Sequence, residues 1–309
     1  MKVVFMGTPD FAVPTLEAIY NNGHQIPLVI TQTDKQKGRG KKVTPPPVKE
    51  KALELGIQVH QPHNVNDKET ITMLKEISPD VIVVVAYGQI LKEEILNLPK
   101  YRCINVHASL LPRYRGAAPI NWVIINGENR TGVTIMEMSK GLDTGDMLLK
   151  EEIEIGQDET AGNLHDRLMS IGANLLTKTL NELEKGNIVK VPQNDEESTY
   201  APIMTKSLGK INWDKCGSEI KNLVRGTQPW PGSFFEYEGK NVKILEVDVD
   251  NKFKEGKNGE IVKVNKDGIF VNVEDKCVII KRIQFPGKKA MSIEEFLRGN
   301  KFECGISLK

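Results

Sequence analysis

The sequence has little charge imbalance, no long apolar run and few aromatic residues. Its 309 residues carry 42 Lys and Arg against 41 Asp and Glu, a formal net charge of +1. No field over the whole molecule would therefore attract a nucleic acid or a membrane, and a polyanionic partner needs a local patch. The apolar run DVIVVVA at 80–86 is far shorter than a membrane span, and the apolar run at the start of MKVVFMGTPDF is too short for a signal peptide. We expect a cytoplasmic protein without a membrane partner.

Cysteine is also scarce. The four cysteines show no paired spacing and no clustered histidines: Cys103, Cys216, Cys277 and Cys304. The sequence thus predicts neither a zinc site nor a disulfide framework, and we expect reduced thiols and no metal.

The pattern of the chain changes near residue 192. Before that point, apolar runs alternate with helical patterns, of which 48–55, 68–77 and a long one from Thr160 to about Leu183 are the clearest. This alternation predicts an α/β domain with a Rossmann-like, doubly wound and mostly parallel sheet. We place this domain at 1–191 and a linker at 192–206, which is polar and contains two prolines.

Residues 207–309 have a different character. Short β-rich runs separated by Gly, Asn and Asp predict a smaller β-barrel domain of OB-like type. Residues 206–309 carry 20 Lys and Arg against 15 Asp and Glu. A mildly basic domain therefore follows a mildly acidic one.

Three polar residues in the first domain suit acyl transfer to an amine. Asn105 and His107 share one face of a short predicted strand, at the carboxyl end where open α/β sheets bind ligands. Asp143 follows in a glycine-bounded loop, GLDTGD. Asn105 and His107 could donate hydrogen bonds to a developing oxyanion, each worth about 3 kcal/mol. Asp143 could favour the charged imidazole and accept the proton that the amine loses, directly or through water. The alternative is a buried histidine bound to a backbone carbonyl, with aspartates that merely form turns.

The run NVHASLLPRYRG at 105–116 and the run from Gly132 to Asp146 resemble the 10-formyltetrahydrofolate-dependent formyltransferases. The resemblance implies a Rossmann-like catalytic domain, a catalytic triad of Asn105, His107 and Asp143, and 10-formyltetrahydrofolate as formyl donor. It also implies a folate site with two walls, formed by Ser109, Leu110, Leu111 and Pro112 and by Tyr87, Gly88, Gln89 and Ile90. Glu137 departs from the pattern, because a neutral polar residue is expected there.

Other segments bear on the acceptor. GTPDFAVP at 7–14, TQTDKQKGRGKKVTPPPV at 31–48 and IKNLVRGTQPWPGS at 220–233 resemble the methionyl-tRNA formyltransferases. The second of these places five positive charges within eight residues: Lys35, Lys37, Arg39, Lys41 and Lys42. Such a loop can fold against phosphates, although most charge runs are only solvated.

We expect Arg39 to enter the acceptor stem, because its planar fork can pair with base edges or phosphate. Lys206 and the basic second domain would hold the rest of the acceptor arm by backbone contacts. The predicted function is formylation of methionine on charged initiator tRNA, in translation initiation, by a monomer that forms no covalent intermediate. Two alternatives remain: a sugar-nucleotide formyltransferase, and a non-catalytic RNA-binding protein. A nicotinamide-dependent oxidoreductase is disfavoured because G-x-G-x-x-G is absent.

Overall fold

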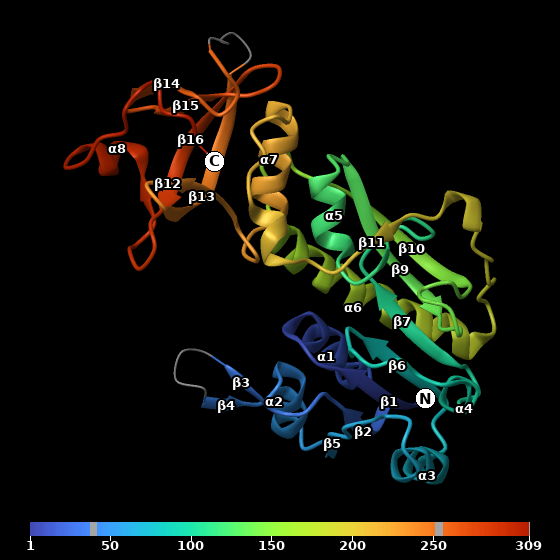
Figure 1. Cartoon of the computed structure of the whole chain (residues 1–309). Helices are drawn as coiled ribbons and strands as arrows, with labels where there is room; N and C mark the ends of the chain where they lie inside the picture. Colours follow the sequence, from blue (N-terminus) through green and yellow to red (C-terminus); the bar gives the residue numbers. More distant parts are fainter. Residues whose placement is uncertain (38–41, 251–255, 309) are drawn as a thin grey trace. The chain divides into compact units, whose positions relative to one another are not determined.

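The computed structural model describes residues 1–37, 42–250 and 256–308 (Figure 1). The predicted RNA contacts Arg39 and Lys41 lie outside these ranges. The chain divides into two compact units. The first unit comprises Met1–Gly116, Thr131–Ile153 and His165–Tyr200, and the second comprises Ala117–Arg130, Glu154–Leu164 and Ala201–Lys309. Within the described ranges, no helix is long and apolar enough to cross a membrane.

The first unit is built on a seven-stranded sheet. Its strands, in spatial order, are β10 (Met147–Glu154), β9 (Arg130–Glu137), β7 (Cys103–His107), β6 (Val81–Val85), β1 (Lys2–Gly7), β2 (Gln25–Ile30) and β5 (Val59–His60). The five strands from β7 to β5 are parallel, and β9 pairs antiparallel with β7. Every residue of β6 is buried, as an unbroken apolar run requires when both faces of a parallel sheet are covered. The predicted Rossmann-like, mostly parallel sheet is confirmed.

The helices predicted at 48–55, 68–77 and from Thr160 to about Leu183 correspond to α2 (Pro47–Glu54), α3 (Lys68–Ile77) and the long α6 (Ala161–Lys185), which belongs to the first unit from His165 onward. The first unit also contains α1 (Val13–Asn21) and α4 (Glu93–Leu96). The side chain of Asp67 accepts a hydrogen bond from Thr70 N and so caps the first turn of α3. Short 3₁₀ turns lie at η1 (Asp10–Ala12) and η2 (Asp195–Glu197).

Strand order reverses between β1 and β6, and this reversal decides where a ligand can bind. The chain runs from β1 outward through β2 and β5, then returns to β6 on the other side of β1. Carboxyl ends at such a switch point form a crevice that favours ligand binding. Thr8, just after β1, donates from Oγ1 to Tyr87 O at 2.9 Å and accepts from Gln32 N at 3.3 Å. The segments that follow β1, β2 and β6 are thereby tied together.

The second unit contains a separate antiparallel sheet, in the part of the chain where the sequence predicts a smaller OB-like β-barrel. Its order is β12 (Ser233–Tyr237), β13 (Lys240–Asp250), β16 (Cys277–Gln284), β15 (Gly268–Asn272) and β14 (Ile261–Asn265), and β17 (Met291–Ser292) pairs with β16. Its helical segments are α5 (Pro119–Ile125), η3 (Lys206–Gly209), α7 (Gly217–Gly226) and α8 (Ile293–Leu297). Helix α7 packs against α5 and β13 (Figure 1).

The predicted linker at 192–206 contains ordered elements. Besides η2, it includes β11 (Tyr200–Ala201), which pairs with β8 (Arg115–Gly116). The second unit also takes in two stretches from earlier in the chain, 117–130 and 154–164. The boundaries at 1–191, 192–206 and 207–309 remain predictions.

Candidate active site

Strand β7 positions Asn105 and His107. Asn105 lies between Val84 of β6 and Met136 of β9, and the side chain of His107 is buried. His107 Nε2 lies 2.9 Å from Tyr114 O. A carbonyl oxygen can only accept, so Nε2 carries a proton and the neutral ring presents Nδ1 as an acceptor. The histidine is thus bound to a backbone carbonyl through one nitrogen, while the other is available for chemistry.

Asp143 faces that second nitrogen. Its Oδ2 lies 3.7 Å from His107 Nδ1, too long for a direct hydrogen bond, and accepts a hydrogen bond from Gly116 N at 2.8 Å. The carboxylate side chain is only 15% exposed. A neutral imidazole with a free Nδ1 can take a proton, and a protonated one beside Asp143 can donate from Nδ1. This is the acid–base pairing that the predicted chemistry needs.

The loop that carries Asp143 has little conformational freedom. Asp143 adopts a φ of 52°, in the left-handed region that non-glycine residues rarely occupy. A Cβ on Gly145 would lie 1.8 Å from Glu137 O, so the backbone of the loop packs directly against the end of β9. No residue with a side chain fits there without displacing backbone.

Gln193 braces this loop, and sequence reasoning missed it. Its Nε2 donates to Asp143 O at 2.8 Å and to Gly145 O at 2.7 Å. Its Oε1 accepts from Arg115 Nε at 3.0 Å, and Arg115 Nη2 reaches Asp195 Oδ1 at 2.7 Å. Gln193 lies fifty residues beyond Asp143, within the predicted linker. No local motif marks it, because only the tertiary fold brings it to the loop.

Glu137, the one departure from the family pattern, ends β9. Its carboxylate pairs with Lys190 Nζ at 2.5 Å and with Arg102 Nε at 3.5 Å. The negative charge is therefore matched by two cations, and neither of them belongs to the triad.

One predicted wall of the folate site, residues 109–112, is anchored on β9. Ser109 is fully buried and donates from Oγ to Arg113 O at 2.7 Å. Thr134 Oγ1 of β9 donates to Ser109 O at 2.7 Å and accepts from Leu111 N at 3.1 Å. Leu111 is buried beside Met136, whereas Leu110 and Pro112 are half-buried. Contact of this segment with folate stays a prediction.

The other predicted wall, residues 87–90, offers fewer groups to a ligand. Tyr87 is 2% exposed within an apolar cluster, and burial raises the pKa of its phenol well above the usual value. Gln89 is engaged through its amide, because Oε1 accepts from Val65 N at 2.8 Å and Nε2 donates to Pro62 O at 3.3 Å. Ile90 is 82% exposed and Gly88 has a φ of 91°. Contact of residues 87–90 with folate stays a prediction.

The described ends of the basic segment form a pair of short strands. Strand β3 (Lys35–Lys37) pairs antiparallel with β4 (Lys42–Thr44). At its base, Lys49 Nζ binds Asp34 at 2.8 Å and Gln61 Nε2 donates to Asp34 Oδ1 at 2.9 Å. These two hydrogen bonds, that of Lys49 first, lower the pKa of Asp34. Lys206 is exposed at the start of η3 in the second unit. All these RNA contacts remain predictions.

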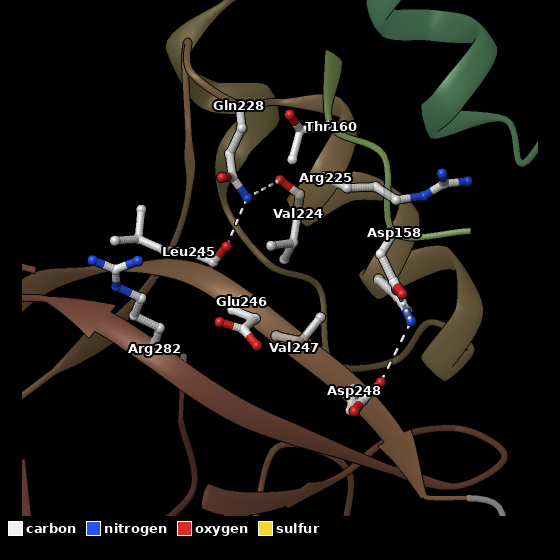
Figure 2. A pocket seen from close by; sticks show the side chains of 11 residues that line it. Asp158, Thr160, Val224, Arg225, Gln228, Leu245, Glu246, Val247, Asp248 and Arg282 are labelled. Atoms are coloured by element: carbon white, nitrogen blue, oxygen red, sulfur yellow. Dashed lines mark hydrogen bonds and ion pairs between the residues drawn. The ribbon is translucent and has the colours of Figure 1, made fainter. Parts of the chain in front are cut away.

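Two other charged features do not form a comparable site. A cavity of about 480 Å³ in the second unit is lined by α7, β13, β16 and residues 158–160 (Figure 2). Lys221 on its wall binds Asp158 at 2.6 Å and Asp248 at 3.4 Å, while Gln228 Nε2 donates to Val224 O and Leu245 O. These groups satisfy one another and tie segment 154–164 to α7 and β13.

The second feature is a group of side chains whose ligand atoms lie close enough together to hold a metal ion. Within the described ranges, Cys216, Glu219 and Glu274 form such a group. The hydrogen bond to Glu274 is the main cause that raises the pKa of the Cys216 thiol to about 11. Both glutamates are exposed, and exposed acidic groups are commonly found close together without an ion.

Comparisons with known proteins identify the family of the chain. Residues 1–180 match the family described as "Formyl transferase", and residues 203–301 match "Formyl transferase, C-terminal domain". The chain is 55% identical over 305 residues to the methionyl-tRNA formyltransferase of Alkaliphilus oremlandii, covering 99% of this chain and 98% of that protein. It is 53% identical over 308 residues to that of Clostridioides difficile, with 100% of both chains covered.

Among solved structures, a sugar 3N-formyl transferase, WlaRD, in the presence of dTDP and 5-N-formyl-THF superposes with a TM-score of 0.70. It is 23% identical and the match covers 94% of this chain and 99% of that one, which supports the fold alone. The resemblance inferred from the sequence motifs is confirmed by the family match and by the relatives. The chain therefore belongs to the formyl transferase family, together with these methionyl-tRNA formyltransferases.

Proposed function

We propose that this chain transfers a formyl group from 10-formyltetrahydrofolate to the α-amino group of methionine on charged initiator tRNA. The observation that carries the proposal is the match over nearly the whole chain, at 55% identity, to a methionyl-tRNA formyltransferase. The pairing of His107 with Asp143 supports it, because it provides the acid–base group that the reaction needs. We further propose that the chain acts as a monomer in the cytoplasm and uses no metal.

The chain's residues account for each step of the transfer. The amine nitrogen forms a bond to the formyl carbon, and the bond from that carbon to the donor nitrogen breaks. Asn105 and protonated His107 donate hydrogen bonds to the oxygen that gains charge in between, a term of about 3 kcal/mol per donor. Asp143 accepts the proton that the amine loses, directly or through water, and a proton returns to the donor nitrogen. No bond to the protein forms at any stage.

A trial of acceptors tests this function. The enzyme would be supplied with 10-formyltetrahydrofolate and, in turn, charged initiator tRNA, charged elongator tRNA and a sugar-nucleotide amine. We expect formyl-methionine on initiator tRNA to form fastest. Preferred turnover of the sugar nucleotide would support the rival enzyme, and no turnover with any acceptor would support a non-catalytic RNA-binding protein.

Arg39 tests the choice among tRNAs. If it reads a weakly paired end of the acceptor stem, Arg39→Ala should lower kcat/KM for initiator tRNA by about 10- to 1000-fold and for elongator tRNA much less. Arg39→Lys should also be impaired, because the charge remains but the fork is lost. The matched control is Lys288→Ala with Lys289→Ala, which should weaken all tRNAs alike and reduce the salt dependence of binding. If Arg39→Ala lowers kcat/KM equally for both tRNAs and Arg39→Lys retains full activity, the loop binds phosphate without distinguishing the tRNAs.

A further inference from the structure

The side-chain amide of Gln193 donates both of its N–H groups to the loop that carries Asp143. Its two N–H groups point to two carbonyls of that loop, Asp143 O at 2.8 Å and Gly145 O at 2.7 Å. The carbonyl oxygen of the amide faces Arg115 Nε at 3.0 Å. A flipped amide would set N–H against N–H and oxygen against two oxygens, so this arrangement fixes the orientation of the amide.

The loop needs such a brace. A residue other than glycine persists in the left-handed conformation only when its surroundings hold it there, and Asp143 has a φ of 52°. The same backbone conformation determines where the Asp143 carboxylate lies relative to His107 Nδ1, 3.7 Å away. Gly116 N holds the carboxylate from one side, while Gln193 holds the carbonyls of the loop.

Arg115 connects the contact made by Gly116 with the contacts made by Gln193. It precedes Gly116 in the chain, and its guanidinium bonds both Gln193 and Asp195. The guanidinium side chain is 11% exposed, whereas that of Asp195 is 82% exposed. The contact between Arg115 and Gln193 is therefore shielded from water, whereas Asp195 at the other end is not. We expect the hydrogen bonds of Gln193 to contribute more to the position of Asp143 than the Arg115–Asp195 ion pair does.

We propose that Gln193 is a positioning residue for formyl transfer, which acts by holding the Asp143 loop in the conformation that presents its carboxylate to His107. This inference rests on the proposed function. It gives the segment at 192–206 a role in the active site of the first unit, where the sequence indicates only a linker.

The most informative variant is Gln193→Glu. Its carboxylate has nearly the shape of the amide and can still accept from Arg115, but it has no donor for the two carbonyls. The matched control is Glu196→Gln, the reverse exchange at an exposed position of η2. A displacement of catalytic groups by about 1 Å can lower a rate about 100-fold. We expect the single-turnover rate of Gln193→Glu to fall about 10- to 100-fold, with KM for tRNA changed less than about 3-fold.

A double variant distinguishes positioning from a general loss of stability. If Gln193 acts through Asp143, Gln193→Glu should lower the rate of an Asp143→Asn enzyme by less than about 3-fold. A loss as large as that in the wild-type background would overturn the proposal, and so would a Gln193→Glu single variant with wild-type kcat. Asp195→Asn should lower kcat by less than about 3-fold, because its ion pair is exposed.

Hydrogen–deuterium exchange provides a readout that does not depend on activity. Without the brace, backbone amides of residues 141–146 should exchange faster in Gln193→Glu than in wild type or Glu196→Gln. Unchanged exchange would overturn the inference whatever the wild-type enzyme does. Failure of the proposed function is a separate outcome, since it would appear as a wild-type enzyme that formylates no acceptor.

Discussion

Replacement of Asp143 by Asn tests the charge of the carboxylate while retaining its shape. The amide oxygen of Asn can still accept from Gly116 N, which lies 2.8 Å from Asp143 Oδ2, so the loop should keep its position. The change removes the negative charge that faces His107 and, with it, the proposed acceptor of the amine's proton. It therefore separates the chemical role of the Asp143 carboxylate from its packing.

The distance gives the size of the effect. Two unit charges 3.7 Å apart, the separation of His107 Nδ1 and Asp143 Oδ2, attract each other by about 4.5 kcal/mol at an effective dielectric constant of about 20. Part of this is offset by desolvation of the buried groups. A net loss of about 2.7–4 kcal/mol in the transition state corresponds to a rate about 100- to 1000-fold lower. Binding of tRNA should be nearly unchanged, because neither group is assigned to the RNA.

The assay is single-turnover formylation of charged initiator tRNA at saturating enzyme and folate, with tRNA affinity measured separately. His107→Ala should show a loss of at least about 100-fold, since it removes the other partner. An Asp143→Asn rate within about 5-fold of wild type, with folding intact, would refute the catalytic pairing of His107 and Asp143.

Three further predictions concern pH, helix capping and close packing. The single-turnover rate should rise from pH 6 to 8, because only the unprotonated amine attacks and an α-amino group titrates at about pH 8. A steady fall of the rate over this range would contradict the mechanism. Asp67→Ala should lower the free energy of unfolding by about 1 kcal/mol at pH 7. The hydrogen bond from the backbone of Thr70 lowers the pKa of Asp67. The stabilisation by the cap is therefore present above the pKa of Asp67 in the unfolded chain and is lost as the pH falls through its pKa in the folded chain. Denaturant unfolding should show a smaller difference in stability between wild type and Asp67→Ala at pH 3 than at pH 7, and equal differences would contradict the capping role. Gly145→Ala should abolish most activity because its Cβ would meet Glu137 O at 1.8 Å, whereas Gly299→Ala, where nothing lies within 4 Å, should match wild type in activity and thermal unfolding; equal behaviour of the two variants would count against the close packing of the loop.

The sequence was sufficient for elements whose signal is local. The run at 81–85 is wholly apolar and forms a buried strand, and helix α3 occupies the predicted residues 68–77. Asn105 and His107 could be paired from sequence because residues two apart in a strand face the same way. The family itself was identified from motifs of adjacent residues, which the comparisons confirm.

Some expectations about individual side chains depended on surroundings that no motif specifies. The family resemblance places Tyr87 in a ligand wall, and its contact with folate stays a prediction; the structure adds that its side chain is only 2% exposed. A short motif does not state which of its side chains point inward when the chain turns after a strand. Ile90, three residues later, is 82% exposed.

Only the tertiary structure decided how distant segments meet. It set the 3.7 Å separation of His107 from Asp143, assigned the proton on the histidine through Tyr114 O, and brought Gln193 from a predicted linker to the Asp143 loop. Such contacts depend on which strands are neighbours and on the closure of long loops. Neither the strand order nor loop closure produces a periodic pattern in the sequence of the residues involved. The sequence by itself determined the elements and the chemical groups available, while packing of the sheet determined their geometry.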